Sequence, residues 1–177
     1  MEFIIWLLPI IFMIHDFEEI IFMKPWIEKN RADLARRFPA ISQKILPHYD
    51  SLTSSAFSLI VAEEFILISV VALITMLYQT YGLWFAALMG FSIHLVVHIG
   101  QWLVFGRYVP VIVTSLLALP YVIYASVLYM SSKIISGPVM IVLSILGLLG
   151  VIFNYLFATW IARRFNDWLV HYFLKTN

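Results

Sequence analysis

The sequence predicts an all-α, polytopic membrane bundle of five transmembrane helices. Of its 177 residues, 63% are hydrophobic and 12% are charged, against roughly 45–50% and 25% in soluble domains. Five apolar stretches are each long enough to cross the roughly 30 Å hydrocarbon core of a bilayer as a helix. Their apolarity is continuous and does not alternate, which argues against membrane strands. We expect one domain over residues 1–177.

The predicted elements follow one another with short connections after the first. The spans lie at residues 3–23, 52–78, 83–104, 109–130 and 138–162. The segments at 25–50 and 163–177 mix basic residues with large apolar ones, which is typical of helices on a membrane surface. Pro25 is expected to begin the helix of the first such segment, because proline is favoured in the first turn.

The basic residues indicate the orientation of the chain. For five spans, six Lys and Arg fall in the first connection, one in the third and three in the C-terminal tail, and Lys133 alone falls opposite. Loops rich in Lys and Arg stay in the cytoplasm, so we expect the N-terminus outside and the C-terminus in the cytoplasm. The net charge of +1 gives no basic face for nucleic acid. The absence of cysteine excludes disulfides and thiolate sites.

A polar cluster, His15-Asp16-Phe17-Glu18-Glu19, interrupts the first apolar stretch. A charged side chain inside a span costs a few kcal/mol at least, so it persists where it has a partner or a function. Successive helical residues are rotated by about 100°, which places His15, Glu18 and Glu19 within one sector of roughly 100°. These side chains are therefore expected to converge on one face.

Five carboxyl groups lie inside the predicted spans, and no lysine or arginine does; the acids are Asp16, Glu18, Glu19, Glu63 and Glu64. Unpaired carboxylates are not sustainable in a low dielectric, so they are either protonated or neutralised by metal cations. His94 and His98 are four residues apart, the spacing by which two imidazoles bind one ion. All these residues lie roughly 8 to 20 Å below the same membrane face.

The sequence therefore predicts a metal centre inside the membrane. Its expected ligands are His15, Glu19, Glu63, His94 and His98, holding one or two divalent ions, with zinc favoured and iron or manganese possible. Glu18 or Glu64 is the expected general base. Asp16 is expected to orient a ligating imidazole, and Asn154 to join helices or contact substrate.

The motif His15-x-x-Glu18-Glu19 in a first apolar helix, followed by an acidic pair and then a histidine in later helices, resembles the HXXEE-motif family of small bacterial membrane proteins. The resemblance covers residues 1 to about 160. It implies a helical protein of the bacterial cytoplasmic (inner) membrane, with His15, Glu18 and Glu19 as the named positions. It implies no particular activity.

The predicted function is that of an intramembrane metal-dependent enzyme acting on a membrane lipid or another lipophilic substrate. A metal-activated water would make it hydrolytic, and two irons would make it oxidative. The alternatives are a metal-free acid–base isomerase of a hydrophobic substrate, a carrier for divalent cations or protons, and a non-catalytic subunit. The oligomeric state is left open, with a dimer possible.

Overall fold

The computed structural model describes residues 2–174, and this part of the chain is helical almost throughout, without strands. Its elements are α1 (Glu2–Arg37), α2 (Pro39–Ser51), α3 (Ser54–Tyr78), α4 (Tyr81–Phe105), α5 (Ile112–Ser132), α6 (Gly137–Leu169) and a π-helical turn η1 (Val170–Leu174). The all-α prediction is confirmed.

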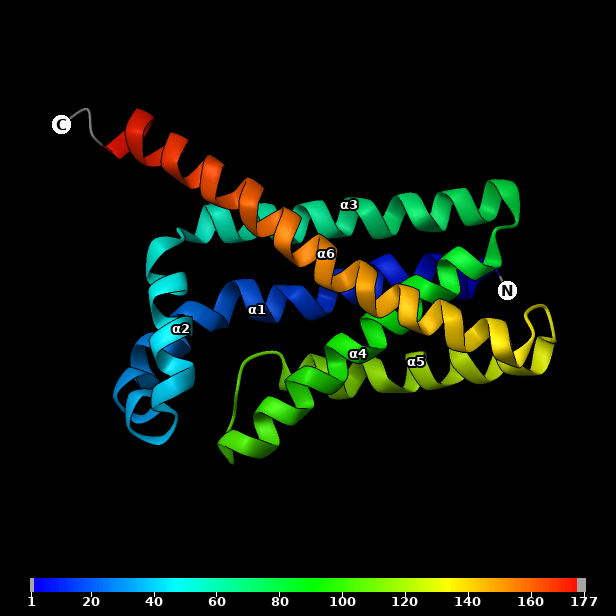
Figure 1. The fold of residues 1–177 in the computed structure, drawn as a ribbon, viewed down its shortest axis with the longest axis horizontal. Helices are drawn as coiled ribbons and strands as arrows, with labels where there is room; N and C mark the ends of the chain where they lie inside the picture. The colour runs from blue at the N-terminus through cyan, green and yellow to red at the C-terminus, as the bar shows by residue number, and fades with distance from the viewer. Residues whose placement is uncertain (1, 175–177) are drawn as a thin grey trace.

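The long helices run back and forth along one axis of the molecule (Figure 1). α1 packs mainly against α3, and α4 packs mainly against α6 and α5. α6 crosses obliquely over α3 and α4, and α2 lies at the end of the bundle where α1 ends. α1 therefore begins, and α6 ends, at opposite ends of the bundle.

Four helices in the described residues are long and apolar enough to cross a membrane, and they are α3, α4, α5 and the helix from Gly137 to Phe173. The predicted number of five is therefore not reached. α1 does not qualify because Asp16, Glu18 and Glu19 interrupt its apolar sequence. The polar cluster that suggests a functional site is thus also the feature that makes α1 less apolar than the other long helices.

The first connection differs from the prediction at Pro25. α1 continues through this proline to Arg37, and the break falls at Phe38, immediately before Pro39. A residue that precedes proline is disfavoured in the helical region, and Phe38 has φ −133° and ψ 59°. The segment 25–50 is therefore the end of α1 followed by α2. The C-terminal segment likewise continues α6 into η1, and residues 175–177 lie outside the described part.

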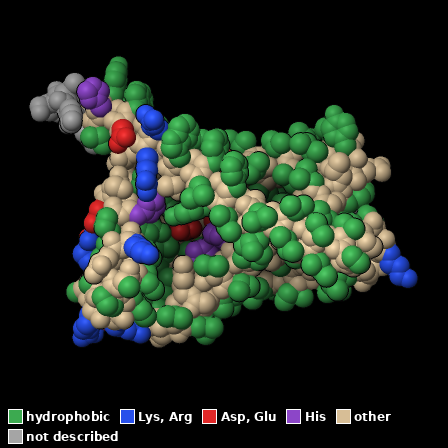
Figure 2. Space-filling model, in the orientation of Figure 1, with side chains coloured by type: hydrophobic (Ala, Val, Ile, Leu, Met, Phe, Trp, Pro, Cys, Tyr) green, Lys and Arg blue, Asp and Glu red, His purple; other side chains and the backbone are tan. Residues whose placement is uncertain are grey.

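The surface of the bundle is apolar along its length and charged at one end (Figure 2). Large hydrophobic side chains such as Leu117 and Phe153 are each 72% exposed. Lys and Arg side chains gather at the end that α2 covers, whereas Lys133 follows α5 at the opposite end. At the end that α2 covers, Arg107 donates a hydrogen bond to Asp33 at 2.5 Å, tying α1 to the α4–α5 connection. This distribution fits a bundle surrounded by lipid.

A glycine permits a close approach of α6 to α4. A Cβ atom built on Gly147 of α6 would lie 2.2 Å from the carbonyl oxygen of Ala86 on α4, whereas one on Gly150 would meet nothing within 4 Å. Because backbone cannot move aside cheaply, we expect Gly147→Ala to lower the free energy of unfolding by about 1–3 kcal/mol. Gly150→Ala is the matched control and should stabilise the helix by about 0.5–1 kcal/mol. Thermal unfolding in detergent measures both, and equal stabilities would contradict this packing.

Candidate metal centre

Three imidazoles meet between α1 and α4. Ring centroids of His94 and His98 are 4.4 Å apart, and those of His15 lie 5.2 and 5.3 Å from them. One nitrogen of each ring lies within 4.8 Å of the corresponding nitrogens of the other two. Nε2 of His94 is 3.0 Å from Nε2 of His98. Zinc–nitrogen bonds of about 2.0–2.1 Å bring two ligating nitrogens to roughly this separation.

An acid from α1 joins these imidazoles. Oδ1 of Asp16 lies 3.9 Å from Nε2 of His15 and 4.0 Å from Nε2 of His94. Asp16, Glu19 and His94 form a second set of possible ligands, and His94 belongs to both sets. The sequence predicts Asp16 as an orienting residue only, but the structure places its oxygen among the possible ligand atoms.

Two of these atoms are buried without a hydrogen bond, namely Nε2 of His15 and Oδ1 of Asp16. The two side chains are 0% and 2% exposed. A buried polar atom without a partner costs about 1–3 kcal/mol, so such atoms call for an explanation. A cation between them and His94 would supply the missing partner for both.

Gln101 orients one of the imidazoles, and the sequence analysis missed it. Its Oε1 lies 3.0 Å from Nδ1 of His98. If Nδ1 carries the proton and donates it to this oxygen, Nε2 presents its lone pair to His94 and His15. Metal-binding histidines are commonly oriented in this way. The signal in the sequence was the spacing, because Gln101 follows His98 by three residues on the same helix.

Glu18 does not face the imidazoles in the same way. Its Oε2 accepts hydrogen bonds from the backbone N–H and from Oγ1 of Thr114, at 2.9 and 2.7 Å, and its Oε1 accepts one from Tyr108 at 2.8 Å. Thr114 lies in the first turn of α5, where N–H groups lack partners and the helix dipole favours an anion. Glu18 is thus stabilised without a metal.

The residue before α5 shows that this turn is constrained. Val111 has φ 75° and is fully buried. A β-branched residue is rarely found in this left-handed region, and such conformations cluster at functional sites. The carbonyl oxygen of Val111 accepts hydrogen bonds from the N–H and Oγ of Ser115. At this strained turn, the backbone N–H of Thr114 points at Glu18 on α1.

Thr114 connects Glu18 to His15. Its Oγ1 donates to Glu18 and lies 3.2 Å from Nδ1 of His15, so it can accept the Nδ1 proton. That proton position leaves the lone pair of His15 on Nε2, the atom that faces Asp16. Two effects raise the pKa of the Tyr108 hydroxyl to about 12: partial burial, which is the larger, and the hydrogen bond to Glu18. The hydroxyl is therefore protonated at neutral pH and donates to Glu18.

We expect Thr114→Val to weaken metal binding by about 10- to 100-fold, because an unoriented imidazole is a poorer ligand. Thr114→Ser retains the hydroxyl and should restore most of the affinity. Competition with a chromophoric zinc chelator measures both variants. Equal affinities for Thr114→Val and the wild type would show that the hydroxyl does not orient His15.

The acidic pair of α3 contacts Asn154 of α6. Nδ2 of Asn154 on α6 donates to Oε2 of Glu63 at 3.1 Å and lies 3.5 Å from Oε1 of Glu64. Glu64, Asn154 and His94 line a cavity of about 290 Å³. Among the described residues, neither glutamate belongs to the two sets of close ligand atoms. The interhelical bond expected of Asn154 is present.

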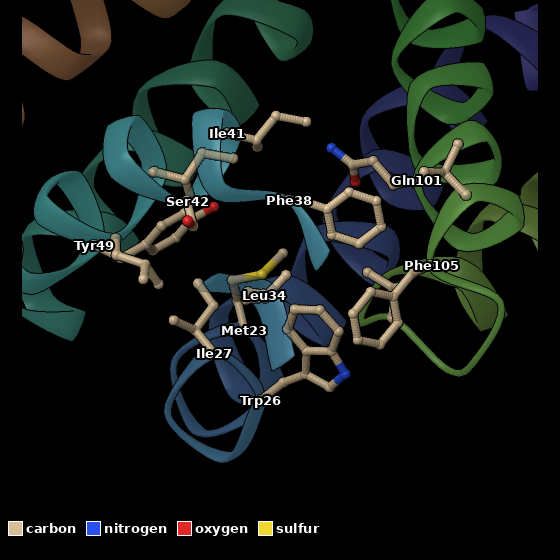
Figure 3. Close-up of a pocket in the computed structure, with 14 residues that line it drawn as sticks. Met23, Trp26, Ile27, Leu34, Phe38, Ile41, Ser42, Tyr49, Gln101 and Phe105 are labelled. Atoms are coloured by element: carbon tan, nitrogen blue, oxygen red, sulfur yellow. The ribbon is translucent and has the colours of Figure 1, made fainter. Parts of the chain in front are cut away.

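A second cavity, of about 170 Å³, lies under α2 at the basic end of the bundle. Figure 3 shows Gln101 beside Phe38, with Tyr49 and Met23 across the cavity. The walls are mostly apolar. Gln101 thus contacts His98 on one side and this cavity on the other.

Comparison with known families supports the resemblance seen in the motif. The model of the family described as "Protein of unknown function with HXXEE motif" matches residues 6–125. The chain belongs to this HXXEE family. The comparisons with curated proteins and with solved structures found no match.

The structure gives each residue of the HXXEE motif a different environment. His15 and Glu19, one helical turn apart, lie in the sets of close ligand atoms. Glu18 instead bonds to the first turn of α5 and, through Thr114, to His15. The spacing of the motif therefore combines two possible ligands with one residue that orients the first of them.

Proposed function

We propose that this HXXEE protein is an intramembrane metal-dependent enzyme that acts on a lipid or other lipophilic substrate. The observation that carries the proposal is a pair of buried atoms without hydrogen bonds, Nε2 of His15 and Oδ1 of Asp16. These two atoms are 3.9 Å apart, and Oδ1 of Asp16 is 4.0 Å from Nε2 of His94. Imidazole and carboxylate together suit zinc, iron or manganese.

The ligands we propose are His15, His94, His98 and Asp16, with Glu19 completing the set or binding a second ion together with Asp16, whose carboxylate has two oxygens. A bound zinc ion would activate a water molecule and polarise a carbonyl or phosphoryl oxygen. Hydrolysis of an ester, amide or phosphate bond is the proposed reaction. If two irons bind instead, the proposed reaction is oxidation of the hydrocarbon chain of the substrate.

Glu64 is the better candidate for the general base. Both oxygens of Glu18 are occupied by Thr114 and Tyr108, which favours a positioning role for that residue. Glu64 lines the same cavity as His94 and so borders the space in which a substrate would lie. In this proposal Glu63 is not a base but accepts a hydrogen bond from Asn154, the residue that also contacts Glu64.

We further propose that the bundle lies in the cytoplasmic membrane of a bacterium, with the polar segment of α1 inside it, the N-terminus outside and the basic end in the cytoplasm. Because the chain has no cysteine, single cysteines report the orientation directly. A membrane-impermeant maleimide should label Lys133→Cys in intact cells and Lys29→Cys only after permeabilisation. The opposite pattern would reverse the orientation.

Elemental analysis of the detergent-purified protein, together with hydrolysis of membrane lipid extracts, tests the function. We expect stoichiometric zinc or iron, and a lipid-cleaving activity that a chelator removes and the metal restores. Absence of metal would overturn the proposal and favour the acid–base isomerase. Metal uptake into proteoliposomes without lipid cleavage would favour the carrier.

A further inference from the structure

The cavity between α3, α4 and α6 is polar at one end only. Its lining residues with polar side chains are Glu64, His94 and Asn154, and the remainder, including Leu83, Phe91 and Val71, are apolar or glycine. The three polar residues lie toward the end of the bundle that α2 covers. α4 begins at Tyr81 at the other end and reaches the α2 end at Phe105, so His94 is nearer to α2 than Leu83 is. The lining therefore changes from polar to apolar along the helix axes.

The cavity is elongated along the helix axes. Leu83 and His94 both line it and are separated by about 16 Å along α4 at 1.5 Å per residue. An elongated cavity with a mostly apolar lining suits an extended hydrocarbon chain.

The mouth of the cavity opens beside Gly150. This residue lines the cavity, yet a Cβ atom there would meet nothing within 4 Å. On the face shown in Figure 2, acidic and histidine side chains are visible in a hollow bordered by hydrophobic and basic side chains. A molecule in the surrounding lipid could therefore reach the polar end from the side.

We propose that this cavity holds one linear hydrocarbon chain of an amphiphilic substrate, with its polar end at His94, Glu64 and Asn154 and its tail toward Leu83. The inference rests on the proposed function and names the substrate class for that site. The polar end of the lining would face the polar end of such a molecule, and the apolar end would face its hydrocarbon tail. With the basic end in the cytoplasm, it also matches the direction of a lipid in the cytoplasmic leaflet, whose head group faces the cytoplasm.

Photolabelling of the full chain in phosphatidylcholine–phosphatidylglycerol vesicles tests this. Two palmitic acid probes are used, one with a diazirine at the tail terminus and one with it near the carboxyl group. We expect the first to label the cavity near Leu83 and Val71, and the second to label it near His94 and Asn154. A reversed pattern, or labelling spread evenly over the lipid-facing surface, would overturn the inference.

Gly150→Leu places a side chain in the mouth of the cavity and should remove most of this labelling. Gly137→Leu is the matched control, since it is the same change on the same helix, also in open space and away from the cavity. The metal content of both variants should equal that of the wild type. Labelling unchanged in Gly150→Leu would overturn the inference, whereas lack of metal in the wild type would overturn the proposed function alone.

Discussion

His94→Ala should abolish stoichiometric metal binding. His94 belongs to both sets of close ligand atoms, so its loss leaves neither set with three members. We expect the affinity for zinc to fall by more than about 100-fold, the upper end of what loss of a merely orienting residue costs. Elemental analysis and chelator competition on the purified variant give the measurement.

His171→Ala is the control for this change. His171 lies exposed in η1, away from the cluster, so its removal should leave the metal content as in the wild type. His94→Ala should also remain folded, because its side chain is 30% exposed and its absence leaves a polar cluster that water can enter. A folded His94→Ala variant that retains one metal ion per chain would show that the ion is bound elsewhere.

Asp16→Leu should make the metal-free protein more stable. The carboxyl group is 2% exposed and its Oδ1 has no hydrogen bond. Replacing such a group by an apolar one of similar size removes a desolvation cost of about 1–3 kcal/mol. The same variant should lose the stabilisation by metal, which for a bound ligand at 100 times its Kd is about 2.7 kcal/mol. Unfolding measured with and without zinc separates the two effects.

Asp167→Leu provides the comparison, because this acid is exposed on α6 and lies outside the cluster. Its metal-free stability should change little, and zinc should stabilise it as it stabilises the wild type. If Asp16→Leu instead destabilises the metal-free protein, then Asp16 has a protein partner that stabilises it, and the argument for a cation at this position fails. The expected result, a more stable metal-free protein that has lost its metal site, would match the stability that natural proteins commonly give up at functional sites.

Much of the fold could be predicted because membrane helices are encoded locally. Continuous apolar runs predict α3 to α6 to within a few residues at most ends. Two predictions were wrong. The number of helices that qualify as spans among the described residues is four, without α1. No helix begins at Pro25, because the sequence shows a residue that can begin a helix but not the packing that carries α1 past it. Trp26 donates to the carbonyl oxygen of Tyr108 at 2.8 Å, a contact across the bundle that local sequence does not specify.

Part of the candidate centre was also accessible from the sequence. Helical periodicity alone places His94 beside His98, and His15 one turn from Glu19. It could not separate Glu18 from Glu19, because both fall within the same sector of α1. That separation depends on which helix packs against each side of α1, and the partner of Glu18, Thr114, is 96 residues away in the sequence.

The sequence by itself determined that this is a helical, membrane-type chain in which acids and histidines occur without cationic partners in apolar segments, because composition and spacing are local properties. Only the tertiary structure decided which of those groups share a space: it set Asp16 among the imidazoles, tied Glu18 to the start of α5 and placed Glu64 beside a cavity. The reason is physical. A helix fixes the angle between its own side chains, whereas the rotation of one helix against another is fixed by packing over the whole bundle.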